Sequence, residues 1–235
     1  MTVVLDLQGV SKDYRGLRPL RIARLTVAEG EQMALLGLDQ MSAEVFVNLV
    51  TGASLPDAGH VLVFGRATSA IADSADWLAT VDRFGLVSER AVLLESLTVV
   101  QNLAMPFTLE VEPPSDEVRG QAERLAVEAG LPEDVWARPV MELDPAGHAR
   151  VRLGRALALN PAILLLEHVN AGLDVAAARL LAADLRATAT RRGAALVAAT
   201  ADEAFAGSIG GRVLRLDPAT GRFTDQRGWL GRWLG

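Results

Sequence analysis

The short apolar run at residues 163–166 constrains the fold more than any other part of the chain. It reads ILLL, begins two residues after Pro161 and is followed directly by Glu167 and His168. An all-apolar run of this length, bounded by a proline and by polar residues, is typical of a parallel strand that is buried on both faces. Ligands of parallel sheets bind at the carboxyl ends of the strands, so Glu167 and His168 are predicted to lie at a functional rim.

A second segment has the layout of a phosphate-binding loop. Residues 32–36 read QMALL and predict another buried strand, which ends at Gly37. The apolar residues that follow, over 45–50, are spaced for one face of a helix, and Ser42 is the expected cap of that helix. A strand, a loop that starts with glycine and a helix together form the setting in which backbone N–H groups bind phosphate.

Composition narrows the class of protein. Half of the 235 residues are hydrophobic but only 5% are aromatic, which suits an α/β protein with buried parallel strands. The net charge is −6 and no basic stripe is present, which argues against a nucleic-acid partner. The chain has no cysteine, and Lys12 is its only lysine. The layout of a signal peptide and an apolar run of roughly 18 residues are both missing, which predicts a cytoplasmic protein.

Residues 89–139 differ in character from the rest of the chain. Helical patterns at 98–105 and 115–129 are separated by proline-containing breaks, which indicates a helical insertion between strands of the sheet. Beyond the central run, residues 175–192 predict an amphipathic helix and residues 194–199 a further buried strand.

Three segments together carry a resemblance to a known family. Residues 149–166 read ARVRLGRALALNPAILLL, residues 170–174 read NAGLD and residues 97–106 read LTVVQNLAMP. With these segments at this spacing, nearly the whole chain resembles the ATP-binding subunit of ABC transporters, in particular subunits of lipoprotein-release and lipid-trafficking systems.

The resemblance implies a single α/β domain over residues 1–235. A P-loop NTPase-like core with a mainly parallel sheet and an antiparallel β subdomain is expected from residues 1–88 and 151–235. Residues 89–150 are expected to form the helical subdomain.

The phosphate loop departs from the family pattern GxxGxGK(S/T). Residues 37–44 read GLDQMSAE, so the loop keeps its first glycine but lacks the lysine and the hydroxyl that would hold phosphate and Mg²⁺. Asp39 and Glu44 add negative charge where a polyanion would lie, which favours a strand–turn–helix with a solvated acidic turn. The positions that correspond to the family's loop are Gly37, Gln40, Ser42, Ala43 and Glu44.

The positions that the resemblance assigns to catalysis are also altered. Glu167 and His168 stand where the family has an aspartate and a catalytic glutamate, Ala201 stands at the switch histidine, and Glu89 stands at the glutamine of the Q-loop. Glu167 is able to hold Mg²⁺ through water and His168 to act as a base. The favoured interpretation is a polar pair that ends the strand.

The signature motif LSGGQ corresponds to LDPAG here. Asp144 adds a negative charge and Pro145 removes an N–H donor, so this segment is predicted to be a poor partner for a nucleotide on a second subunit. Tyr14 stands where the family stacks an aromatic ring on adenine, and Asp174 keeps the aspartate of the D-loop. The signature positions are Leu143, Asp144, Pro145, Ala146 and Gly147.

The remaining clusters predict no further chemistry. The three histidines, His60, His148 and His168, lack metal-ligand spacing. The expected role of Arg150, Arg152 and Arg155 is a surface face paired with acids. Trp229 and Trp233 are expected to dock on the core of the protein.

Three functions compete. The first is a structural or regulatory subunit of a membrane transport complex that has lost ATP hydrolysis and binds ATP and Mg²⁺ weakly or not at all. It would dock a membrane permease through residues 89–106 at the inner face of the membrane, as a homodimer or with another ATP-binding subunit. The second is a working ATPase that uses Glu167 and His168, with arginines in place of lysine. The third is a free cytoplasmic scaffold. The transported substrate is not encoded in these residues.

Overall fold

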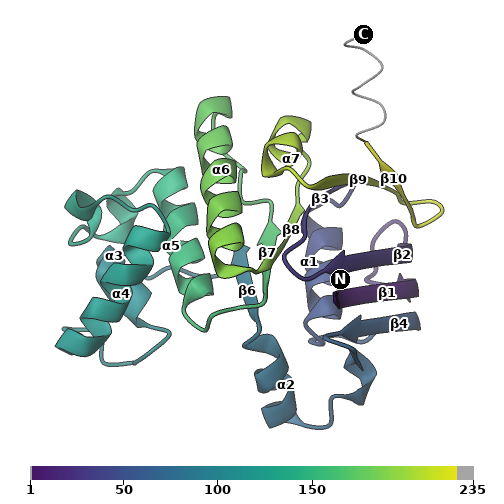
Figure 1. Cartoon of the computed structure of the whole chain (residues 1–235), viewed down its shortest axis with the longest axis horizontal. Coiled ribbons are helices and arrows are strands. Elements are labelled where there is room, and N and C mark those ends of the chain that lie inside the picture. Colours follow the sequence, from purple (N-terminus) through teal and green to yellow (C-terminus); the bar gives the residue numbers. More distant parts are fainter. Residues whose placement is uncertain (1, 227–235) are drawn as a thin grey trace.

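The central sheet of the protein has six strands, seen in the computed structural model, which describes residues 2–226. The strands are β3 Gln32–Leu36, β6 Phe84–Ser88, β7 Ile163–Glu167, β8 Ala195–Ala199, β9 Arg212–Asp217 and β10 Arg222–Asp225. Their order across the sheet is β10-β9-β3-β8-β7-β6 (Figure 1). All neighbours pair in parallel except β10, which runs antiparallel to β9.

The strand β7 is buried on both faces because its residues alternate between two apolar cores. Ile163 and Leu165 pack into the core that contains α1, whereas Leu164 and Leu166 pack into the core on the opposite face of the sheet. None of the four side chains is more than 1% exposed. This confirms the predicted buried parallel strand.

A smaller antiparallel sheet covers one side of the molecule. Its strands are β1 Val3–Lys12, β2 Leu20–Ala28, β4 Ala58–Val63 and β5 Arg66–Ala67, in the order β2-β1-β4-β5. The helix α1, Gln40–Val50, contributes Phe46 and Leu49 to a core shared by this sheet and the central one. The antiparallel subdomain that the sequence predicts is therefore present.

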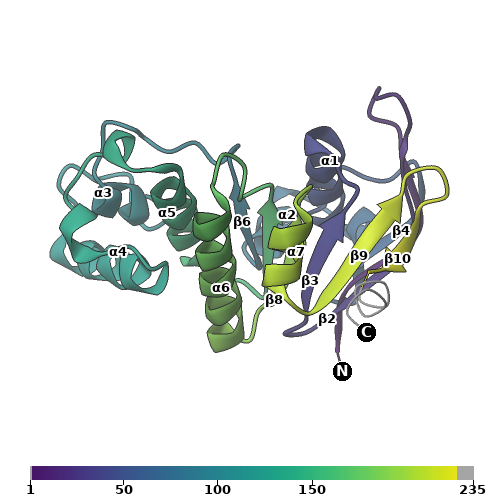
Figure 2. The same ribbon diagram turned by 90° about the horizontal axis from the view of Figure 1, so that it is seen from above.

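The other helices lie on the opposite side of the central sheet or at its end. They are α2 Ser74–Val81, α3 Val99–Ala104, α4 Asp116–Glu128, α5 Pro145–Leu157, α6 Val175–Arg192 and α7 Glu203–Ile209, with short 3-10 turns at Thr68–Ala70, Glu133–Val135 and Val140–Glu142. Helices α3, α4 and α5 gather beyond α6, away from the antiparallel sheet (Figures 1 and 2). The predicted mixture of a mainly parallel sheet, an antiparallel sheet and inserted helices is confirmed.

Helix boundaries follow local capping chemistry. The helix α6 covers the predicted residues and ends at Gly193, whose φ of 64° suits glycine. The sequence pattern also predicts an arginine-rich helix over 149–159, but α5 begins four residues earlier, at Pro145, and ends at Leu157. Asp144 caps this helix by accepting the Gly147 N–H at 2.6 Å, and proline fits the first helical position because no intrahelical donor is needed there.

Within residues 2–226, no helix has both the length and the apolar character needed to cross a bilayer. Trp229 and Trp233, the two tryptophans expected to dock on the core, lie outside the described residues.

Candidate functional site

The turn after β3 is shaped by Gly37. Its φ is 88°, and a Cβ atom at this position would lie 2.7 Å from the Leu216 carbonyl oxygen of neighbouring β9. A side chain is therefore excluded both by the left-handed backbone and by the close approach of β9. This geometry leads the chain directly from the central sheet into α1.

The N-terminus of α1 is occupied by a carboxylate of the chain itself. Asp39, not Ser42, is the capping residue, which corrects the sequence prediction. The Asp39 carboxylate accepts the Ser42 hydroxyl at 2.6 Å and the Ser42 N–H at 2.8 Å. The hydrogen bond from the Ser42 hydroxyl contributes most to lowering the pKa of Asp39 below its ordinary value, followed by the bond from the Ser42 N–H. The nearby His168 lowers this pKa further, whereas partial burial opposes the shift. The acidic residue of this turn, Asp39, therefore serves as the cap of α1.

The next two positions of the loop differ sharply in environment. Ala43 is completely buried in the core beneath α1. Glu44 is 44% exposed, and its Oε1 lies 3.2 Å from Nη1 of Arg90. The predicted strand–turn–helix with an exposed acidic turn is present, and the structure adds that Asp39 is hydrogen-bonded and Glu44 ion-paired within the fold.

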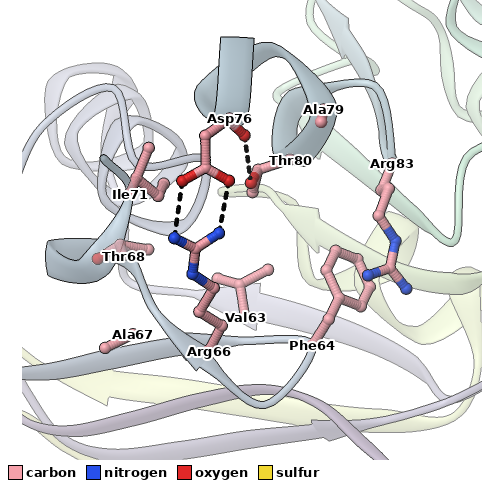
Figure 3. Close-up of a pocket in the computed structure, with 10 residues that line it drawn as sticks. All are labelled: Val63, Phe64, Arg66, Ala67, Thr68, Ile71, Asp76, Ala79, Thr80 and Arg83. Atoms are coloured by element: carbon pink, nitrogen blue, oxygen red, sulfur yellow. Dashed lines mark hydrogen bonds and ion pairs between the residues drawn. The ribbon is translucent and has the colours of Figure 1, made fainter. Parts of the chain in front are cut away.

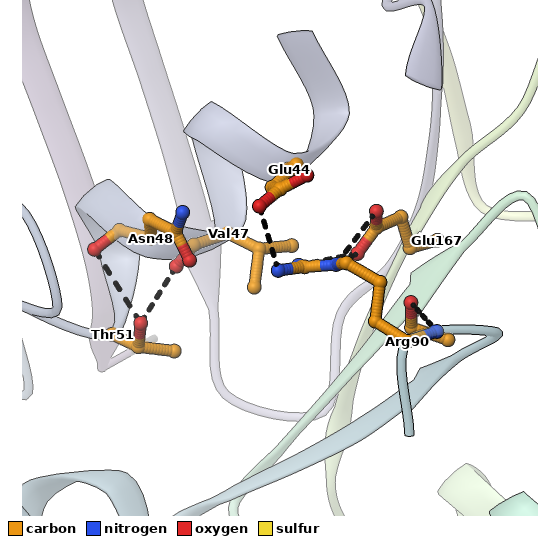
Figure 4. Close-up of polar contacts among 7 residues, drawn as sticks. Glu44, Val47, Asn48, Thr51, Arg90 and Glu167 are labelled. Carbon is orange, nitrogen blue, oxygen red and sulfur yellow. Dashed lines mark hydrogen bonds and ion pairs between the residues drawn. The ribbon is translucent and has the colours of Figure 1, made fainter. Parts of the chain in front are cut away.

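Arg90 also reaches the end of β7 (Figure 4). Its Nη2 donates to Glu167 Oε2 at 2.7 Å, and its Nε lies 3.2 Å from both carboxylate oxygens. The Glu167 side chain has no solvent exposure, and Arg90 is its only hydrogen-bond or ion-pair partner within residues 2–226. Glu167 does end β7, as expected, and the structure adds that it is a buried ion-pair partner of Arg90. We call Glu44, Arg90 and Glu167 the arginine bridge.

Sequence reasoning missed Arg90. It lies two residues after β6, and the parallel register aligns Ser88 of β6 with Glu167 of β7. The Arg90 N–H donates to the hydroxyl of buried Ser88 at 3.1 Å, which fixes where its side chain starts. The available signal was an arginine just beyond the end of a strand predicted to lie near the strand that carries Glu167.

His168 adopts an unusual conformation. Its φ is 47°, which is uncommon for a residue other than glycine, and its N–H donates to the Ala199 carbonyl of β8 at 2.9 Å. The ring Nε2 is buried and lacks a hydrogen-bond partner among the described residues. A strained backbone and an unsatisfied buried nitrogen in one residue mark His168 as a candidate functional group.

Side-chain hydrogen bonds among Thr200, Asn170 and Asp202 hold the loop after β8, where the family has its switch histidine. The Thr200 hydroxyl donates to Asn170 Oδ1 at 2.9 Å, and Asn170 Nδ2 lies 3.3 Å from Asp202 Oδ2. Ala201, at the family's switch position, is exposed. Ala201 itself therefore brings no hydrogen-bonding or titratable side chain to the switch position.

Tyr14 lines a pocket of about 170 Å³ next to α1. Asp39, Ser42 and Arg18 line the same pocket. Burial, and then the charge of Asp39, raise the pKa of the Tyr14 hydroxyl, and the predicted stacking on adenine stays a prediction.

The signature and D-loop positions form a separate group. Glu89, Pro145 and Gly172 line one pocket of about 270 Å³ that also contains His148 and Arg152. Asp174 caps α6 by accepting the Ala177 N–H at 2.8 Å, just as Asp144 caps α5. Leu143, Ala146 and Gly147 flank or begin α5.

A further pocket, of about 260 Å³, lies between the β4–β5 turn and α2 (Figure 3). The Arg66–Asp76 ion pair crosses it, with Nη2 and Oδ2 2.7 Å apart, and Arg83 stacks on the ring of Phe64. Its lining includes none of the residues predicted from the sequence to act on a ligand. In the described part of the chain, no three acidic or histidine side chains are grouped as a metal site.

Comparison with known proteins gives this geometry a context. No protein-family model matches the chain. The chain is 29% identical over 202 residues to the methionine import ATP-binding protein MetN of Mesorhizobium japonicum, in a match that covers 86% of this chain and 54% of the relative. It is 29% identical over 220 residues to the sulfate/thiosulfate import ATP-binding protein CysA of Caulobacter vibrioides, covering 92% of this chain and 62% of the relative. The chain thus spans less than two thirds of these relatives.

Solved structures agree on the fold. The protein cbiO1 of Clostridium perfringens, part of the ABC transporter complex cbiONQ, has a TM-score of 0.83 and 19% identity, covering 99% of this chain and 92% of that one. An ATP-binding cassette solved as a dimer with ADP and Pi has a TM-score of 0.76 and 24% identity, covering 95% of this chain and 99% of that one. The chain is related to the ATP-binding subunits of ABC transporters. Its fold is that of an ATP-binding cassette.

Within these ABC relatives, the finer type is a separate question. The two curated relatives described above are named as import proteins. The resemblance to lipoprotein-release and lipid-trafficking subunits therefore stays a prediction, as do the roles of the individual site residues.

Proposed function

We propose that this ABC-type subunit does not hydrolyse ATP and serves as a structural or regulatory component of a membrane transport complex. The observation that carries the proposal is the arginine bridge. A guanidinium group already neutralises Glu44 and Glu167, which flank the place where the resemblance puts Mg²⁺ and the terminal phosphate.

The residues present fit a triphosphate poorly. The helix N-terminus that would receive phosphate donates the Ser42 N–H to Asp39, so an incoming phosphate would have to displace a carboxylate. Like charges repel at this distance, and Ala43 offers no compensating cation. Lys12, the only lysine, lies 3.0 Å from Asp57 instead.

The fit to Mg²⁺ is also poor. Magnesium requires oxygen ligands in nearly ideal octahedral geometry. Both oxygens of Glu167 accept hydrogen bonds from Arg90, and a metal ion bound there would meet a positive guanidinium at close range. No reaction step is assigned to a metal at this position.

The partners follow from the relationship to ABC subunits. The relatives are named as ATP-binding proteins of import systems, and one related cassette was solved as a dimer. We propose that the chain pairs with itself or with an intact ATP-binding subunit. It would bind a permease at the inner face of the membrane, through residues 89–106.

Isothermal titration with Mg-ATP, followed by an assay of phosphate release, tests the proposal. We expect no saturable heat at micromolar protein and no turnover, with a related cassette that has an intact phosphate loop as the positive control. Micromolar affinity together with measurable turnover would overturn the proposal. Recovery of a permease from native membranes would separate a transport subunit from a free scaffold.

One observation favours a second candidate, an ATPase with an atypical site. His168 has a left-handed backbone and an unpartnered buried Nε2, both of which recur at catalytic positions. Under this candidate, His168→Ala abolishes turnover. Under the first, wild-type protein and variant are equally inactive.

A further inference from the structure

Three consecutive residues, Arg90, Ala91 and Val92, are each held through a guanidinium group. The side chain of Arg90 reaches into the central sheet and meets Glu167, which is fully buried. The carbonyls of the next two residues are held from the other side, by arginines of α5. The segment is therefore fastened to the sheet at one point and to α5 at two.

The contacts from α5 differ from the pairing predicted for its arginines. Only Arg150 pairs with an acid, Asp184. Arg152 Nε donates to the Ala91 carbonyl at 3.3 Å and Arg155 Nη1 to the Val92 carbonyl at 2.7 Å. The predicted surface face paired with acids is therefore wrong for these two residues.

Burial is consistent with a fixed position for both side chains. It lowers the pKa values of Arg152 and Arg155; for Arg155 the neighbouring Arg152 charge adds to this effect, whereas for Arg152 the Glu89 carboxylate opposes it. Neither guanidinium forms an ion pair with a carboxylate of residues 2–226, so the backbone carbonyls are the acceptors of their hydrogen bonds. These hydrogen bonds therefore fix the two guanidinium groups and the Ala91 and Val92 carbonyls relative to one another.

Two apolar side chains at the end of this segment and just after it are exposed to solvent. Val92 is 71% exposed and Leu94 is 40% exposed. Met141 is 64% exposed, and its N–H donates to the carbonyl of Glu95, next to Leu94 in the chain, at 3.1 Å. This is the start of the surface through which docking to a permease is proposed above.

We propose that Arg90 is a positioning residue which, with Arg152 and Arg155, holds residues 90–92 in one conformation without any ligand, so that the docking surface is preset and does not respond to nucleotide. The role of this surface in docking rests on the proposed function, whereas the fixed conformation of residues 90–92 is testable by itself. The arginine bridge provides a cation and two carboxylates from within the chain, so no nucleotide or metal ion is needed to select this conformation.

Amide hydrogen exchange on the full chain, without nucleotide, tests the positioning. The amides of Arg90 and Ala91 donate to the Ser88 hydroxyl and carbonyl, so both report on the segment. The Leu94 amide donates to Asn102 Oδ1 at 2.9 Å and serves as an internal control, because buried Asn102 holds it independently of Arg90. In wild-type protein, all three amides are expected to be protected, with or without Mg-ATP.

Three variants separate positioning from simple stability. Arg90→Met should speed exchange at residues 90 and 91 by about tenfold or more while Leu94 stays protected. The double variant Arg90→Met with Glu167→Gln removes the unpaired buried charge, so global stability should recover while exchange at 90 and 91 stays fast. Glu44→Gln is the matched control, because it removes only the exposed partner, and exchange should stay within about twofold of wild type.

Unchanged exchange at residues 90 and 91 in the double variant would overturn the inference, as would protection in wild type that changes on adding Mg-ATP. The outcomes are distinct from those of the proposed function. Turnover of ATP with a rigid segment would overturn only the proposed function, whereas an unprotected segment in an inactive protein would overturn only this inference.

Discussion

Arg90 and Glu167 are 77 residues apart in the chain, yet the arginine Nη2 lies 2.7 Å from the Glu167 Oε2 at the buried end of β7. The carboxylate has no solvent exposure, and among residues 2–226 this guanidinium is its only ion-pair partner. Breaking a buried pair by removing one partner leaves an uncompensated charge in a low-dielectric interior.

Arg90→Met should therefore lower the free energy of unfolding by about 3–5 kcal/mol. The double variant Arg90→Met with Glu167→Gln should recover most of this loss, because both charges are then gone. Urea denaturation followed by circular dichroism measures both values. Equal stability of wild type and Arg90→Met would show that the pair is not desolvated in solution.

Asp39→Ala should destabilise the protein by about 1 kcal/mol through loss of the helix cap. Asp39→Asn is the matched control, because asparagine caps nearly as well without the charge. Thermal denaturation of the three proteins gives the comparison. If nucleotide affinity stays absent in Asp39→Asn, the acid alone is not what excludes phosphate.

The pH dependence of stability should include a contribution from Glu128. Hydrogen bonds from Arg192, at 2.6 Å to each carboxylate oxygen, lower the pKa of Glu128 in the folded state. A folded pKa below the unfolded value means that the stabilisation is present above the unfolded pKa and is lost as pH falls through the folded pKa. Glu128→Gln should flatten the acid side of the stability profile, and an unchanged profile would contradict the pair.

Gly37→Ala should destabilise by about 1–3 kcal/mol because the new Cβ meets both a left-handed backbone and the Leu216 carbonyl. Gly193→Ala is the control, since its φ is 64° but no atom lies within 4 Å of the added Cβ. The difference in unfolding free energy between the two variants measures the cost of the contact with β9. Equal losses would show that only the backbone conformation matters.

Much of the fold could be predicted because the signals are local. The buried strand at 163–166 follows from its apolar run, and the helix at 175–192 follows from its periodicity. The cap predicted at Ser42 and the helix start predicted at residue 149 are both wrong, because an aspartate further upstream caps each helix. The carboxylates of Asp39 and Asp144 accept an N–H group of the first turn and so fix where α1 and α5 begin.

The candidate site was predicted only in part, because its decisive contacts are not local. The resemblance located Glu44 and Glu167, but not the arginine between them. Likewise, Arg152 and Arg155 read as ordinary surface residues, since nothing in the neighbouring sequence indicates that the carbonyls of Ala91 and Val92 face them.

The sequence by itself determined the elements of the protein: buried strands from apolar runs, helices from periodicity and turns from glycine, because these depend on residues a few positions apart. The tertiary structure alone decided how the charges are used. It placed the end of β6 beside the end of β7, which brought Arg90 to a carboxylate 77 residues away. Burial of that carboxylate then made the pairing obligatory, since a charge without water requires a partner.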